Sequence, residues 1–247
     1  TVSQWNDKSG NGYHATTPTG SPTLNPTGGP GGKPVIEFRS EPNGGSGDDE
    51  LSISGTFTLK DHFYVFRSPS AIWSDYGGIL GGSGSRESSF IFQRNGTHFH
   101  HNKYPSAVWK NGSSITSSNF NLSVINQYMI LRIVVNDNNL GPHSNWKLGD
   151  DGTGWSMDMD LAEAVCFSSQ LSPSDAQKVE GYLAHKWGLS GNLTTNHPYK
   201  SGTVLVGSSP FSTDVASGTG QSLDLSAGTF ATVSTGGTED VFDGDSN

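Results

Sequence analysis

The chain has 247 residues, including 33 Gly, 12 Pro and one Cys, and its formal net charge is −9. The length fits one large all-β domain, and the negative charge disfavours binding to a phosphate backbone, so nucleic acid is not an expected partner. The single Cys166 excludes an internal disulfide framework, and the longest apolar run, at residues 129–135, is too short to cross a membrane as a helix.

Short apolar or alternating segments recur along residues 1–202 between clusters of Gly, Asn, Asp, Ser and Pro. This pattern is typical of a many-stranded antiparallel sandwich. The pair Asn111-Gly112 tolerates positive φ, so it predicts a tight hairpin between residues 107–110 and 113–115. Other expected strands cover residues 35–38, 62–67, 89–93, 129–135 and 160–167.

One helix is predicted at about residues 173–188. Ser172 is a suitable N-cap, Pro173 fits the first turn, and Gly188 can end the helix. An apolar stripe at helical spacing should lie on the sandwich; it consists of Ala176, Val179, Tyr182, Leu183 and Trp187. On the other side we expect Lys178, Glu180 and Lys186 to face water.

The segment 203–247 differs from the rest of the chain, because it holds six acidic residues and no basic residue. It is rich in Gly, Ser and Thr and has too few large apolar side chains to form its own core. We interpret it as a linker or as the opening strands of a second, similar module. Part of residues 211–235 is expected to pair in β-form with the body or with a neighbouring chain.

Several motifs carry a family resemblance. They are WNDKSGNGYHA at 5–15, KPVIEF at 33–38, DELSI at 49–53, DLAEAVCF at 160–167 and GYLAHKWGL at 181–189. Together they resemble concanavalin A-like, laminin-G-type jelly-roll domains of large secreted proteins of aquatic bacteria and of some phage structural proteins. The resemblance covers about residues 2–200. It implies an all-β, two-sheet antiparallel jelly-roll sandwich with one short C-terminal surface helix, at an extracellular, cell-surface or virion location.

Folds of this kind host many unrelated activities. We expect a non-catalytic extracellular recognition or adhesion module, within a larger multidomain surface protein, that binds a glycan or a neighbouring protein module. The alternative is a structural spacer or assembly subunit of a surface layer, filament or virion, which pairs with a neighbouring chain by strand addition or exchange.

A glycan-degrading enzyme is the third hypothesis. Retaining glycosidases place two carboxylates about 5 to 5.5 Å apart, and on this fold one strand typically supplies them in a Glu-x-Asp-x-x-Glu pattern, which is missing here. Asp158 and Asp160 share one face of a predicted strand with Ala162, while Glu163 should point the other way. We expect these carboxylates to lie on the surface or at the rim of the sandwich, and Cys166 to be buried and inert.

Acidic Gly-rich loops predict at least one structural calcium ion, because carboxylate and carbonyl oxygens are the ligands that calcium prefers. The candidate ligands are Asp7, Asn11, Asp48, Asp49, Asp150 and Asp151. A transition-metal site at His98, His100 and His101 is a weaker hypothesis, since no carboxylate or Cys accompanies the cluster in the sequence.

Sugar recognition needs aromatic faces and polar side chains on exposed loops held by a rigid scaffold. The candidate sugar-binding residues are Trp73, Tyr76, Tyr104, Trp146 and Trp155. For each of them, packing in the core or at its rim is the alternative, because Trp is usually largely buried. We assign Trp5 and Trp187 to the core.

Overall fold

The structure is a computed structural model that describes residues 1–9, 11–40, 48–69, 76–82, 92–93, 105–115, 126–137, 141–150, 154 and 156–201. Its strands are β1 (Gln4–Trp5), β2 (Ala15–Thr19), β3 (Thr23–Asn25), β4 (Val35–Phe38), β5 (Glu50–Phe57), β6 (Asp61–Arg67), β7 (Tyr76–Gly77), β8 (Leu80–Gly81), β9 (Phe92–Gln93), β10 (Ala107–Lys110), β11 (Ser113–Ile115), β12 (Met129–Val134), β13 (His143–Leu148) and β14 (Met159–Phe167). Its helices are α1 (Pro173–Lys186) and the short 3₁₀ turns η1 (Pro30–Gly32) and η5 (Ser190–Asn192).

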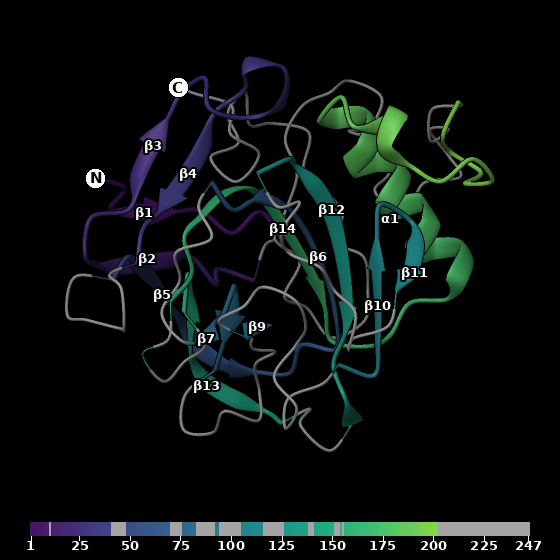
Figure 1. The fold of residues 1–247 in the computed structure, drawn as a ribbon. Helices are drawn as coiled ribbons and strands as arrows, with labels where there is room; N and C mark the ends of the chain where they lie inside the picture. Colours follow the sequence, from purple (N-terminus) through teal and green to yellow (C-terminus); the bar gives the residue numbers. More distant parts are fainter. Residues whose placement is uncertain are drawn as a thin grey trace.

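The strands form two main antiparallel sheets (Figure 1). One sheet has five strands in the order β1-β2-β5-β13-β8, and the other has seven in the order β11-β10-β12-β6-β14-β4-β3. A separate two-stranded ladder pairs β7 with β9. The prediction of a two-sheet antiparallel sandwich with one C-terminal helix is therefore confirmed for the part of the chain that the structure describes.

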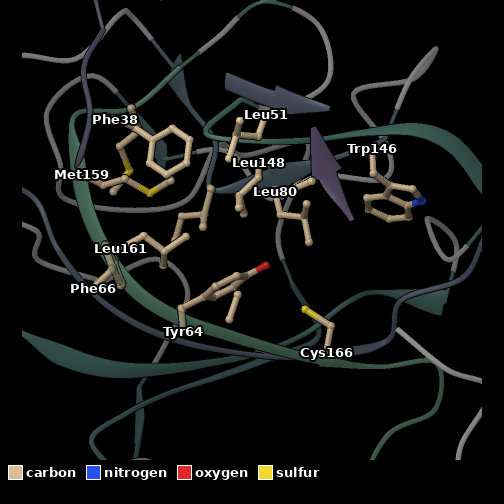
Figure 2. Close-up of a cluster of buried hydrophobic side chains, with 14 of the residues drawn as sticks. Phe38, Leu51, Tyr64, Phe66, Leu80, Trp146, Leu148, Met159, Leu161 and Cys166 are labelled. Carbon is tan, nitrogen blue, oxygen red and sulfur yellow. The ribbon is translucent and has the colours of Figure 1, made fainter. Parts of the chain in front are cut away.

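The main core lies between the two sheets. On the five-stranded sheet, Trp5, Ala15, Ile53 and Trp146 pair in register across four strands and are all at most 1% exposed. Figure 2 shows side chains of both sheets converging in this core; the labelled ones are Phe38, Leu51, Tyr64, Phe66, Leu80, Trp146, Leu148, Met159, Leu161 and Cys166. The burial expected for Trp5 and Cys166 is confirmed.

The central strands of the larger sheet are buried on both faces. Every residue of β12 and β14 is buried, whereas β5 in the smaller sheet has exposed residues at Ser54, Gly55 and Thr56. A strand covered on both faces reads as a continuous apolar run and not as an alternation. The second cover is α1, which packs on the outer face of the seven-stranded sheet, away from β5 and β13 (Figure 1).

Helix α1 begins and ends close to its predicted positions. The Ser172 hydroxyl accepts a hydrogen bond from the Asp175 N–H at 3.2 Å, which satisfies one of the free donors of the first turn. The predicted apolar stripe is confirmed: its five residues are at most 4% exposed and pack against side chains of the sheet, including Phe63, Val65 and Val165. In the residues that the structure describes, no helix is long and apolar enough to cross a membrane.

The expectation that Glu180 and Lys186 face water is wrong. Glu180 is 3% exposed, and the Lys186 side chain is 9% exposed. Glu180 is covered by residues 189–200, which fold back along the helix: His197 Nε2 lies 3.2 Å from Glu180 Oε2, and His185 Nε2 lies 2.7 Å from the Tyr199 carbonyl oxygen. Lys186 Nζ instead lies 3.4 Å from Glu163 Oε1 on β14. The helix is therefore covered on a second side.

The hairpin between β10 and β11 forms as predicted. Asn111 and Gly112 have φ angles of 51° and 76°, the positive values that a type I′ turn requires at both positions. The Asn111 side chain also accepts a hydrogen bond from the Ile130 N–H at 2.8 Å, which fastens the turn to the neighbouring strand.

A β-bulge in β14 changes which way its side chains point. The pairing of β14 with β6 shifts register between Leu161 and Glu163. Because one extra residue reverses the alternation of a strand, Glu163 points toward α1, where its Oε2 accepts a hydrogen bond from Trp187 Nε1 at 2.6 Å. The expectation that Glu163 points away from the face of Asp160 is therefore wrong.

Candidate functional site

Several predicted site residues lie outside the part of the chain that the structure describes. They are Trp73, Tyr104 and Trp155 among the sugar-binding candidates, Asp151 among the calcium candidates, and His98, His100 and His101. Tyr76 contributes its backbone to β7, and its side chain is also outside the description. The roles expected for these residues stay predictions.

Trp146 lies in the core, so its expected role as an exposed sugar-binding residue is wrong. Its side chain is 1% exposed, and its ring stacks on Phe57 with a centroid distance of 5.3 Å. Its Nε1 donates to the carbonyl oxygen of His143 at 3.0 Å. The alternation of β13 turns Trp146 and Leu148 inward together, which leaves no aromatic face for a ligand.

Two of the predicted calcium ligands accept hydrogen bonds from backbone N–H groups in loops. Asp7 accepts the N–H groups of Ser9 and Tyr13 at 2.9 and 3.0 Å, and orders the loop between β1 and β2. Asp49 accepts the N–H groups of Ser21 and Arg39 at 2.5 and 2.9 Å, and so joins segments that are distant in the sequence. Asn11 lies in the loop with Asp7, where its amide N–H groups donate to Ser9.

Ser156 contacts two further predicted calcium ligands, Asp48 and Asp150. The Ser156 hydroxyl donates to Asp48 Oδ2 at 2.8 Å, and Ser156 forms an isolated β-bridge with Asp150. Over the described ranges, no three His, Cys, Asp or Glu side chains gather closely enough to hold a metal ion. With Asp151 outside those ranges, calcium binding stays a prediction.

The two carboxylates weighed for catalysis take part in links between strands. Asp158 accepts the Ser40 N–H at 2.7 Å. Asp160 is 1% exposed and forms ion pairs with Arg39 and Arg67 at 2.8 and 2.7 Å. The expectation of surface or rim carboxylates is wrong for Asp160, because its position in the register of the sheet buries it between Arg67 of β6 and Arg39, which follows β4.

A buried polar cluster lies inside the main core. His62, Tyr64 and Cys166 are 0% exposed, and His62 Nδ1 is 2.7 Å from the Tyr64 hydroxyl. Burial lowers the pKa of His62 to about 4, and burial also raises the pKa of Tyr64, with a further contribution from Cys166. His62 and Tyr64 are therefore neutral at pH 7.

One half-buried aromatic residue stands out on the outer face of the larger sheet. Trp109 lies on β10 beside Val108, and since Val108 points into the main core, Trp109 points outward. Its ring centroid is 4.3 Å from Arg132 Cζ on the neighbouring strand β12, a close cation–π contact.

A buried ion pair fixes the cation beneath Trp109. Arg132 Nε and Nη2 donate to the two carboxylate oxygens of Asp61 at 2.9 and 2.7 Å, and Asp61 also accepts the Leu171 N–H at 3.0 Å. Burial raises the pKa of the Asp61 carboxyl, and the hydrogen bonds and charge of Arg132 oppose that rise. Trp109 therefore rests on a guanidinium group that is held at two points.

The other neighbour of Trp109 in the sheet is small and polar. Ser114 on the edge strand β11 is directly opposite Trp109 and is exposed. We call Trp109, Arg132, Asp61 and Ser114 the Trp109 platform. Trp109 is not among the sugar-binding residues predicted from the sequence, although the Asn111-Gly112 turn fixes its pairing with Ser114 and the alternation from the apolar Val108 indicates its outward direction.

Comparisons of the chain with family models, with curated proteins and with solved structures find no match. The described geometry defines a two-sheet sandwich with an aromatic side chain fixed on the outer face of its larger sheet.

Proposed function

We propose that residues 1–201 form a non-catalytic, extracellular or cell-surface recognition module that binds carbohydrate at the Trp109 platform. The observation that carries this proposal is the fixed position of Trp109: one side of its ring contacts the ion-paired Arg132, and the opposite neighbour is the exposed Ser114. The module would act as a recognition or adhesion unit of a larger surface protein, or of a virion.

The physical basis is preorganisation. An indole ring offers a large, rigid, apolar face at little cost in conformational entropy, and a polar neighbour can orient the hydroxyl groups of a sugar. Holding Trp109 on Arg132, and Arg132 on Asp61, limits the rotamers that a ligand would otherwise have to order on binding. The site stands on strands and not on a loop, which also favours a fixed geometry.

A non-catalytic role is also supported by the carboxylates. Asp160 pairs with Arg39 and Arg67, and Glu163 accepts from Trp187, so each holds positions within the fold. A general acid in a glycosidase needs a raised pKa and access to the glycosidic oxygen.

The test is calorimetric titration of the purified chain with soluble β-glucan, galactan and alginate oligosaccharides. We expect Trp109→Ala to weaken binding at least tenfold and Trp109→Phe to retain part of it, because Phe keeps an aromatic face. Leu24→Ala is the matched control, since Leu24 is 42% exposed on β3, at the opposite edge of the same sheet.

Equal affinity of the wild-type chain and Trp109→Ala, with unchanged melting curves, would reject Trp109 as the binding residue. Hydrolysis or eliminative cleavage of any of the three glycans would reject the non-catalytic role.

An assembly subunit is the second candidate function, and Leu24 favours it. In the described residues Leu24 is the exposed large apolar side chain, and it lies on an edge strand. Pro22 and Pro26 flank β3 and lack N–H donors, so an added strand would find a short pairing edge. Sedimentation velocity tests this role: self-association that is lost in Leu24→Ala or on deletion of residues 203–247 would support it.

A further inference from the structure

The segment that follows α1 is folded onto the turn of the β10–β11 hairpin. We call residues 189–201 the post-helix segment. In this segment the Thr194 N–H donates to the carbonyl oxygen of Asn111 at 3.3 Å. The ring of His197 packs on the next residue of the turn, since a Cβ added to Gly112 would lie 2.6 Å from His197 Cδ2. Two contacts therefore join the post-helix segment to the hairpin that carries the Trp109 platform.

His197 is held in place by α1 and by its own segment. Its Nδ1 accepts a hydrogen bond from the Tyr199 N–H at 3.2 Å. Because Nδ1 accepts, Nε2 carries the proton and donates to Glu180 Oε2 at 3.2 Å. Both His197 and Glu180 are buried. The ring is therefore fixed through both of its nitrogen atoms, with its Cδ2 atom against the turn.

The post-helix segment is itself packed and internally bonded. Leu189 and Leu193 are buried in the apolar cluster between α1 and the seven-stranded sheet. Lys200 Nζ donates to the carbonyl oxygen of Gly191 at 2.9 Å, which ties the end of the segment to its beginning. The turn of the hairpin therefore rests on a packed surface that belongs to the helix side of the molecule.

Strand β11 depends on this support more than β10 does. It has three residues and stands at the end of the strand order, where it pairs with β10. An edge strand is held by a ladder on one side. On the β10 side, Asn111 is also fixed to Ile130 by two hydrogen bonds of 2.8 Å, one from its own N–H and one to its side-chain oxygen. On the β11 side, the contact at the start of the strand is that of His197 with Gly112.

We propose that His197 is a positioning residue for the Trp109 platform. By packing on the turn at Gly112, it fixes β11 and so holds Ser114 beside Trp109 in the geometry that binds a ligand. This inference rests on the proposed function, because it concerns the regulation of the same site. Coupling between two sites is reciprocal, so a glycan that contacts Trp109 and Ser114 together also stabilises the docked post-helix segment.

The first test is hydrogen exchange of the full chain without ligand, followed by peptide mass spectrometry. His197→Ala removes the ring that packs on the turn, so the amides of residues 107–115 should exchange at least about fivefold faster, while those of the central strands β6 and β14 stay unchanged. His197→Gln should restore much of the protection, because its amide group keeps a donor near Glu180. Thr195→Ala is the matched control, since Thr195 is an exposed residue of the same segment, and it should change nothing.

The second test is calorimetric titration with laminarihexaose, a soluble β-glucan oligosaccharide. His197→Ala should weaken binding at least about fivefold, and His197→Gln should weaken it less. In the wild-type chain, laminarihexaose should slow exchange in residues 190–201 as well as in residues 107–115. It should slow neither in Trp109→Ala, which lacks the stacking surface.

If His197→Ala does not fold, exchange of the wild-type chain in rising urea decides. Residues 107–115 and 190–201 should then open together, with one free energy and before β6 and β14. Separate opening of the two segments, unchanged exchange of residues 107–115 in His197→Ala, or equal affinities of this variant and the wild type for laminarihexaose would overturn the proposal. Absence of laminarihexaose binding to the wild type would count against the proposed function alone, and the exchange measurements would then decide whether His197 positions the hairpin.

Discussion

Asp61 and Arg132 form a two-point ion pair beneath the N-terminal end of α1. Their N–O distances are 2.9 and 2.7 Å, Asp61 is 0% exposed and Arg132 is 5% exposed. The pair links β6 to β12, carries the ring of Trp109 and, through the Leu171 N–H, fixes the segment that leads into the helix. The position of the Trp109 ring and the docking of the segment before α1 therefore depend on the same two side chains.

Removing the charge of Asp61 should destabilise the protein strongly. Asp61→Asn leaves Arg132 buried without a counter-charge, and breaking one side of a buried pair costs about 3–5 kcal/mol. Urea unfolding followed by tryptophan fluorescence measures the change. The comparison variant is Lys178→Ala, which breaks the Asp175–Lys178 pair on the helix surface and should cost less than about 1 kcal/mol. Similar losses in the two variants would contradict the assigned role of Asp61.

Gly112 should tolerate substitution less well than Gly12. Both have positive φ, 76° and 74°, so alanine is strained at either position by about 1–2 kcal/mol. At Gly112 an added Cβ would also lie 2.6 Å from His197 Cδ2, whereas at Gly12 it would meet no atom within 4 Å. We expect Gly112→Ala to lower the free energy of unfolding further, by about 1 kcal/mol or more. Equal effects would show that His197 does not pack on the turn.

Stability should fall in mild acid partly because of His62. Its pKa is about 4 in the folded chain and 6.5 as the ordinary value. The folded state therefore keeps His62 neutral while the unfolded state takes up the proton, and stability is lost as pH falls from about 6.5 to about 4, by on the order of 3 kcal/mol.

The variant His62→Asn isolates this contribution, because Asn keeps a polar group near Tyr64 and does not titrate. Urea unfolding of both chains at pH 7 and pH 4 should show a larger loss for the wild type. Parallel losses would mean that His62 is protonated in the folded chain or does not contribute.

Calcium should raise the melting temperature if the predicted site forms. A ligand that binds only the folded state adds about 2.7 kcal/mol to the free energy of unfolding at a hundredfold excess over Kd. Asp150→Asn should remove this effect. Asp158→Asn should not, although Asp158, like Asp150, accepts a backbone N–H. Identical melting curves with calcium and with chelator, in demetallated protein, would contradict the prediction that the folded chain binds calcium.

Local patterns in the sequence determined the elements that depend on neighbouring residues. The Asn111-Gly112 turn, the Ser172 cap and the apolar stripe of α1 all follow from interactions within a few residues, and all three are present. The two-sheet class follows from the same kind of information, because alternating short segments can bury their apolar faces only against another sheet.

Only the tertiary structure decided which side of each strand meets solvent. Alternation shows which residues share a face, but the choice of face depends on partners far away in the sequence, and one inserted residue reverses it. Trp146 and Trp109 both occur on strands, yet pairing turns the first into the core and the second outward.

The bulge next to Ala162 turns Glu163 toward Trp187. Distant contacts of this kind, such as the pairs that Arg67 and Arg132 form with Asp160 and Asp61, fix the positions of the charged side chains, because a charge is buried only where the fold brings its counter-charge.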